Sequence, residues 1–180
     1  MVKMRPRLIR SFTLIELMVV ISIIAILAGL VLGGAGAVRQ RAARNQATSE
    51  MGSIETGLTR YQMDFGSYPT AVAIGTSSNG YAQYSASSYI SNGAILFTAL
   101  WGSSNYSSTS GGKQYLNVKA SMVNTSGTNY FIDPWGYAYG YYWNGSGSLN
   151  GGAVPDVWST GGQSGTQSQT NREKWIASWK

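Results

Sequence analysis

The longest feature of the hydrophobic pattern is an apolar run near the N-terminus. From Leu17 to Val38, about 22 residues, the sequence carries no charge. A helix of this length spans about 33 Å, enough to cross the hydrocarbon core of a bilayer. A soluble core helix usually shows a single apolar stripe, whereas this run is apolar on every face. The pattern therefore predicts a transmembrane helix half at residues 12–38.

Apolar residues become periodic after Arg39. They are spaced by fours and threes, as on one face of a helix: Ala43, Ala47, Met51, Ile54, Leu58, Tyr61 and Phe65. We expect residues 39–65 to continue the first helix as an amphipathic half, giving one helix of about 50 residues. Gly66 and Pro69 then end it, since Gly suits the residue after a helix and Pro cannot continue one.

The remaining segment, 66–180, is rich in Gly, Ser, Asn and Tyr and predicts a domain of short elements. We expect a helix at 94–101 packed on the amphipathic face, strands at 114–123, 129–143 and 154–160, and loops at 75–92, 102–112 and 144–152. The tail at 172–180 either docks as a short amphipathic segment or stays loose.

A turn divides the segment at 129–143. Asp133, Pro134, Trp135 and Gly136 have turn chemistry, with Pro second and Gly fourth. Large rings then alternate with other residues: Tyr137, Tyr139, Tyr141 and Trp143. Rings on one face of a strand more often form a sheet core than a surface that stacks sugars or bases.

Composition excludes several classes of protein. With 11% charged residues and 12% aromatic residues, the 180-residue chain does not resemble a disordered protein. It contains no Cys and no His, which excludes disulfides, thiol catalysis, Cys/His zinc sites and His-based triads. The few acids outside the apolar segment form no evident catalytic pair, so we do not expect an enzyme.

The formal net charge of +6 comes largely from a basic leader at 1–11. The leader carries Lys3, Arg5, Arg7 and Arg10. The rest of the chain has a net charge of only +2, so we expect no nucleic-acid partner. The leader favours a cytoplasmic N-terminus, although Arg39, Arg41 and Arg44 beyond the apolar run weaken the charge asymmetry.

Glu16 is an acid at the start of the apolar segment, and three explanations compete for it. An ordinary signal peptide offers a cleavage site at 35–37 but usually has a shorter apolar stretch, and a plain anchor gives no reason for the carboxylate. An intramembrane charge costs about 2.5 to 3.5 kcal/mol and usually has a partner. A cut between Ser11 and Phe12 would supply one, because the new α-amino group lies close before Glu16.

The sequence FTLIELMVV after a basic leader resembles the N-terminus of type IV pilin-like proteins. The resemblance implies that a prepilin peptidase cuts before Phe12 and methylates the new amino group, which stays cationic. It implies that Glu16 then neutralises the N-terminus of an adjacent subunit during filament assembly. The family prefers Gly before the cut, and we expect Ser11, also small, to be tolerated.

Segments 61–70, 133–141 and 156–162 resemble the major pseudopilin of type II secretion systems. This implies a pilin-like α+β fold, with a long N-terminal helix packed on a small antiparallel sheet domain outside the inner (cytoplasmic) membrane. The implied function is that of a pseudopilus subunit for protein export, with copies of itself, prepilin peptidase, other pseudopilins and an inner-membrane assembly platform as partners. The alternatives are a type IV pilin for adhesion, motility or DNA uptake, and a secreted protein with an ordinary signal peptide.

Small residues recur at steps of four in the apolar run: Ala25, Gly29, Gly33 and Ala37. They predict a seam where helices approach closely, although Gly and Ala are also simply common in membrane helices.

A calcium site in the C-terminal loop is common in major pseudopilins, and Asp156 is a weak candidate ligand. Residues 159–171 contain no Asp or Glu, and Gln163 stands about where an acid is expected. Because calcium prefers six to eight oxygen ligands, we expect no metal and no cofactor, with Asp156 at a strand end or turn.

Overall fold

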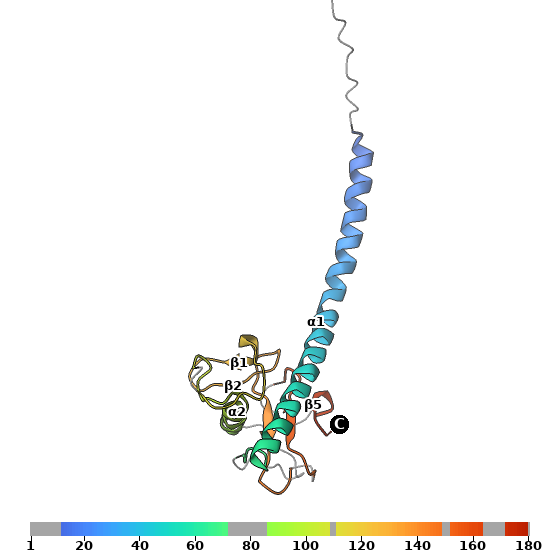
Figure 1. Cartoon of the computed structure of the whole chain (residues 1–180). Helices are drawn as coiled ribbons and strands as arrows, with labels where there is room; N and C mark the ends of the chain where they lie inside the picture. The colour runs from blue at the N-terminus through green and yellow to red at the C-terminus, as the bar shows by residue number, and fades with distance from the viewer. Residues whose placement is uncertain (1–11, 72–85, 109–110, 149–151, 164–171, 180) are drawn as a thin grey trace, which may run out of the picture. The chain divides into compact units, whose positions relative to one another are not determined.

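The computed structural model describes residues 12–71, 86–108, 111–148, 152–163 and 172–179 (Figure 1). The leader, including Ser11, lies outside the described residues. The chain divides into two compact units, Met1–Arg41 and Ala42–Lys180.

The helix α1 (Leu14–Phe65) has 52 residues and runs through the boundary between the two units. The prediction of one helix covering both the apolar run and the amphipathic half is confirmed. Gly66 follows it with a φ of +73°, and its N–H donates to the carbonyl of Gln62 at 2.7 Å. Because residues with a Cβ rarely adopt that φ, Gly66 is suited to end the helix, as predicted.

The second unit adds a second helix and two small sheets to the C-terminal half of α1. The further elements are α2 (Ala86–Trp101), η1 (Ala120–Met122), β1 (Val123–Asn124), β2 (Tyr130–Phe131), β3 (Gly140–Tyr142), β4 (Asp156–Ser159), η2 (Arg172–Lys174) and β5 (Ile176–Ala177). One sheet pairs β1 with β2, the other has the order β3-β4-β5, and all these pairs are antiparallel. The predicted α+β, pilin-like class is confirmed.

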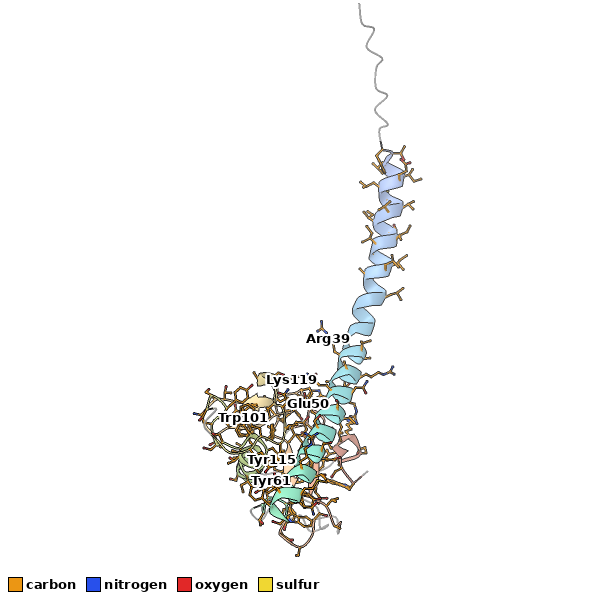
Figure 2. The ribbon with its side chains drawn as sticks, in the orientation of Figure 1. Arg39, Glu50, Tyr61, Trp101, Tyr115 and Lys119 are labelled. Carbon is orange, nitrogen blue, oxygen red and sulfur yellow. The ribbon has the colours of Figure 1, made fainter. Side chains whose placement is uncertain are left out.

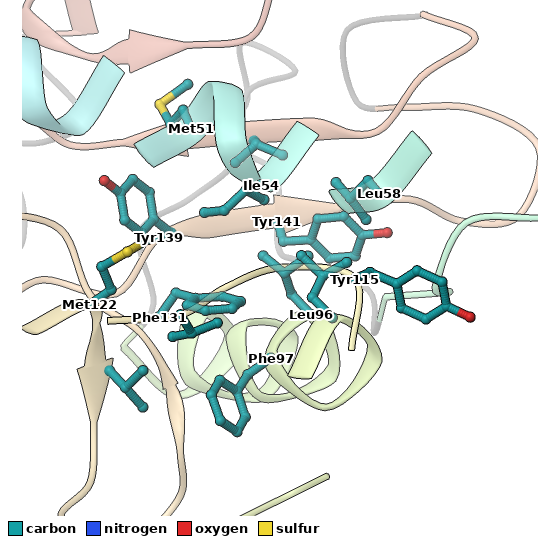
Figure 3. Packing of buried hydrophobic residues seen from close by; sticks show 14 of the residues in the cluster. Met51, Ile54, Leu58, Leu96, Phe97, Tyr115, Met122, Phe131, Tyr139 and Tyr141 are labelled. Atoms are coloured by element: carbon teal, nitrogen blue, oxygen red, sulfur yellow. The ribbon is translucent and has the colours of Figure 1, made fainter. Parts of the chain in front are cut away.

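The core of the second unit forms between α1, α2 and the strands. Met51, Ile54 and Leu58 of α1 are at most 4% exposed. They share one buried cluster with Tyr141 of β3 and Leu96 of α2, and Figure 3 shows Ile54 and Leu58 beside Tyr141. The predicted helical stripe is therefore the face that holds the domain on α1.

The stripe ends earlier than its spacing predicts. Phe65 is 61% exposed, so the expectation that it shares the buried face is wrong. It lies in the last turn of α1, where its ring stacks on Tyr61 at 4.4 Å instead of entering the core.

The predicted helix at 94–101 is confirmed, but α2 begins at Ala86, inside a segment expected to be a loop. Two fully buried residues hold its first half: Tyr89 and Asn92. The amide of Asn92 donates to the carbonyl of Tyr141 at 3.1 Å, which ties this turn of α2 to β3. Much of the segment 75–92 lies outside the described residues.

The predicted strand at 114–123 is wrong for most of its length. Only Val123 belongs to a strand, and η1 occupies the residues before it. The N–H of Tyr115 donates to the carbonyl of Leu100 at the end of α2, at 2.9 Å. The backbone N–H of Tyr115 is therefore bonded to a helix end and is not available to pair with a neighbouring strand.

The strands on both sides of the turn at 133–136 and the strand at 154–160 are confirmed in shorter form. Tyr139 and Tyr141 are fully buried, as the alternation of rings predicts. The C-terminal tail docks, because β5 pairs with β4 and Trp175 is only 4% exposed.

Gly140 and Trp158 face each other across β3 and β4. The indole lies against Gly140, where a Cβ would overlap the ring atoms. The same indole donates to the hydroxyl of Tyr89 at 2.7 Å and stacks on Trp175, so it has little freedom to move.

We expect Gly140→Ala to lower the free energy of unfolding by about 1 to 3 kcal/mol, the usual cost of overpacking a core. Urea unfolding of the full chain in detergent, followed by tryptophan fluorescence, measures it. Gly52→Ala is the matched control, because nothing lies within 4 Å of its Cβ position in α1 and it should stabilise by up to about 1 kcal/mol. An unchanged Gly140→Ala variant would contradict the packing of Trp158.

Candidate functional site

Thr13 and Glu16 form a reciprocal cap at the N-terminus of α1. The carboxylate oxygen Oε2 of Glu16 accepts the backbone N–H of Thr13 at 2.9 Å and its hydroxyl at 2.8 Å. The N–H of Glu16 donates to Oγ1 of Thr13 at 3.3 Å. Glu16 therefore turns its carboxylate back toward Phe12, the residue that would carry the new amino group after cleavage.

Sequence reasoning missed the role of Thr13. The signal was present, because a Thr followed three residues later by Glu before an apolar run is the signature of a capping box. The capping box explains where α1 begins and fixes the orientation of Glu16.

The apolar side chains of the first unit are exposed. Large apolar residues from Phe12 to Leu30 are 47% to 81% exposed, whereas those of the stripe in the second unit are buried. Apolar surface on this scale usually marks contact with another protein or with a membrane. Within the described residues, no helix combines the length and apolarity needed to cross a membrane.

The four small residues of the predicted seam all belong to α1. Ala25 and Ala37 are exposed, and no atom lies within 4 Å of the Cβ position of Gly29. The surroundings of Gly33 lie outside the described side chains. Their role in helix packing stays a prediction.

Asp156 is the first residue of β4 and is 3% exposed. Among the described residues, no three Asp, Glu, His or Cys side chains come together in a way that could hold a metal ion. Gln163 is the last described residue before the segment 164–171, which lies outside the description.

Asp133 is a buried carboxyl that organises the turn before β3. It is 2% exposed, and Oδ1 accepts the N–H groups of Trp135 and Tyr137 at 3.0 and 2.9 Å. Oδ2 accepts the hydroxyl of Ser159 in β4 at 2.6 Å. Burial raises the pKa of the Asp133 carboxyl, although these hydrogen bonds oppose the rise.

Glu50 links α1 to Tyr139, the residue directly before β3. The hydroxyl of Tyr139 donates to Oε2 of Glu50 at 2.8 Å, and the amide of Gln46 donates to Oε1 at 2.8 Å (Figure 2 labels Glu50 on α1). Burial, followed by the bond to Glu50, raises the pKa of the Tyr139 hydroxyl. Both carboxylates have hydrogen-bond partners from other elements, so each ties parts of the domain together.

Comparison with known proteins bears on the N-terminus first. Residues 7–32 match the family model of the prokaryotic N-terminal methylation motif. The chain is 41% identical over 61 residues to the type II secretion system core protein G of Pectobacterium carotovorum, which is 34% of this chain and 39% of that protein. The protein of the same name from Escherichia coli K12 is 41% identical over 61 residues, 34% of this chain and 42% of that protein. The matched segment thus spans less than half the length of these relatives.

A longer match is to a fimbrial protein of Neisseria meningitidis serogroup B. The two are 34% identical over 120 residues, which is 65% of this chain and 69% of that protein. The chain belongs to the type IV pilin-like family. No solved structure gives a significant match. The family predicted from FTLIELMVV is confirmed, and because pilin-like proteins are structural proteins, the assignment agrees with the prediction that the chain is not an enzyme.

The matched motif is that of prepilins, which are anchored in the inner membrane and have a processed and methylated N-terminus. Phe12 and Glu16 lie within the matched residues, so the processing and assembly residues predicted from the sequence fall on the motif itself.

The raised pKa of Asp133 predicts a pH effect on stability. A raised folded-state pKa means that its contribution is full below the unfolded pKa, about 3.9, and is lost as pH rises through the folded value. We therefore expect the free energy of unfolding of the wild type, relative to Asp133→Asn, to increase from about pH 7 toward about pH 4. The increase should be about 1.4 kcal/mol for each unit by which the pKa is raised.

Urea unfolding of both proteins across this pH range provides the measurement. Asp64→Asn is the control with the opposite sign, because Lys113, at 2.6 Å, lowers the pKa of Asp64. The contribution of Asp64 is lost as pH falls through that lowered value. A difference between wild type and Asp133→Asn that stays constant, or shrinks toward low pH, would contradict the burial of an acid at this turn.

Proposed function

We propose that this chain is a structural subunit of a pseudopilus that serves type II secretion, processed and N-methylated by a prepilin peptidase. The observation that carries the proposal is the carboxylate of Glu16, held by Thr13 at the N-terminal end of an exposed apolar helix. It lies within the methylation motif and directly beyond the expected cut before Phe12.

The Glu16 carboxylate can neutralise the positive charge that processing creates at Phe12. Cleavage before Phe12 creates an α-amino group, and methylation leaves it cationic. In an apolar environment an unpaired charge is costly, so the amine and a Glu16 carboxylate attract each other strongly. A pair between the amine of one copy and Glu16 of its neighbour would set the axial register of the filament.

The exposed apolar residues explain the two states of the subunit. Before assembly, residues 12–38 lie in the inner membrane, and the domain at 66–180 lies outside it. During assembly, the apolar helices replace lipid contacts with contacts to one another. Ala25, Gly29, Gly33 and Ala37 would let neighbouring helices approach closely.

The partners follow from this role. They are further copies of the chain, the prepilin peptidase, other pseudopilins and an inner-membrane assembly platform. The similarity to proteins named as type II secretion core protein G supports this choice.

A type IV pilin is the second candidate, because the match to a fimbrial protein covers more of the chain than the matches to the secretion proteins. Such a subunit would use the same N-terminal chemistry, but its filament would serve adhesion, motility or DNA uptake.

We expect Glu16→Ala to leave membrane insertion intact and to reduce filament assembly by about 100-fold or more. The reason is that the unpaired amine of the neighbouring copy would cost about 3 to 5 kcal/mol. Membrane fractionation and electron microscopy of sheared filaments measure the two properties. Ser22→Ala is the matched control, because it also removes a polar side chain from the apolar helix. The hydrogen bond lost there is a local one, from the Ser22 hydroxyl to the carbonyl of Met18 in the same helix.

Normal filaments from Glu16→Ala would refute the proposed pairing. Export of extracellular proteins and surface piliation, measured in the same strains, separate the two candidates. Loss of export with surface pili retained supports the secretion subunit, and the reverse pattern supports the type IV pilin.

A further inference from the structure

Arg39 and Arg41 are two exposed arginines that follow the apolar run in the first unit (Figure 2 labels Arg39). Within the part of the chain that the structure describes, neither makes an ion pair or a hydrogen bond to another side chain. The sequence has no acid between Glu16 and Glu50, so nothing close along the chain neutralises them. Because an exposed guanidinium is weakly hydrated and carries five N–H donors, both side chains are available to a partner from outside the chain.

Arg44, the next basic residue, has a different environment. It is half-buried, and Nη1 donates to the backbone carbonyl of Lys174 at 3.1 Å. Arg44 therefore belongs to the folded domain of the second unit, which leaves Arg39 and Arg41 as the exposed pair.

The spacing of the two arginines limits what the partner can be. At about 100° per residue, positions two apart on a helix point about 200° away from each other. A protein that docks on one side of the helix would reach only one of them. A partner that surrounds the helix would reach both, and the headgroup layer of a bilayer is such a partner.

We propose that Arg39 and Arg41 form an arginine collar that binds the phosphates of anionic phospholipids on the outer surface of the inner membrane. The proposal rests on the proposed function, which puts residues 12–38 in that membrane. The collar begins at the first residue beyond Val38, where a spanning helix would leave the hydrocarbon. Guanidinium groups suit this contact because they bind phosphate oxygens in a bidentate manner.

Basic residues next to a membrane helix are usually concentrated on the cytoplasmic side, and the collar gives a reason for two arginines on the opposite side. Phosphate contacts would hold the end of the apolar helix at the membrane surface while the subunit awaits assembly. Extraction into a filament would have to release these lipids, so the collar would set part of the barrier to assembly.

Native mass spectrometry of the full-length chain in detergent tests the collar. Phosphatidylglycerol or phosphatidylcholine is titrated in, and bound lipids are counted. We expect a preference for phosphatidylglycerol of about 25-fold, from about fivefold for each arginine. The double variant Arg39→Gln/Arg41→Gln should lose the preference. Arg60→Gln should keep it, because it removes the same charge from an exposed position farther along α1.

Three results would overturn the collar: no preference in the wild type, an unchanged preference in the double variant, or an equal loss in Arg60→Gln. Displacement of the lipid by inorganic phosphate would assign the site to free phosphate and would also overturn it. Alkaline extraction of membranes separates this failure from that of the proposed function. A chain released at high pH refutes membrane residence and the collar together, whereas a retained chain without lipid preference refutes the collar alone.

Discussion

The structure depends on how the apolar surface of α1 is covered. In the second unit the stripe formed by Met51, Ile54 and Leu58 is buried by α2 and the strands, and this burial assembles the domain. In the first unit the described apolar side chains are exposed to roughly half their area or more. A helix that buries one half within its own domain and exposes the other is suited to a subunit that is completed by lipid or by further copies.

Charge placement follows the same division. In the second unit the buried carboxyl of Asp133 has donors from the backbone and from Ser159, and Glu50 accepts the hydroxyl of Tyr139, so these acids stabilise the domain. In the first unit, among the residues that the structure describes, Glu16 accepts hydrogen bonds from Thr13 and turns toward the site of the expected amine. Asp133 and Glu50 thus join separate elements of the domain, whereas the bonds of Glu16 are local to the first turn of α1.

Much of the fold could be predicted from local patterns. The spacing of apolar residues gave the course of α1 and its buried face, and the turn at Asp133 with its alternating rings gave β3 and its buried tyrosines. The strand expected at 114–123 failed because the N–H of Tyr115 bonds to the end of α2, a tertiary contact that no local pattern contains. The prediction of a loop up to residue 92 failed for a similar reason, since the first half of α2 depends on the hydrogen bond from Asn92 to Tyr141.

The candidate site was predictable because its chemistry is local. Phe12 and Glu16 are four residues apart, and an acid in an apolar run stands out by its cost. The part of Thr13 was also readable from the capping-box spacing but was missed. The helix seam at Gly29 and Gly33 could not be tested within one chain, because its proposed contacts are with other copies.

The central claim is that the working chain begins at Phe12 with a cationic amine that pairs with Glu16 of a neighbouring copy. Intact mass and N-terminal analysis of the protein from membranes containing a prepilin peptidase tests it most directly. The account predicts a chain that starts at methylated Phe12. A chain that starts at Val38, or one that retains Met1, would contradict it, because neither would have an amine beside Glu16.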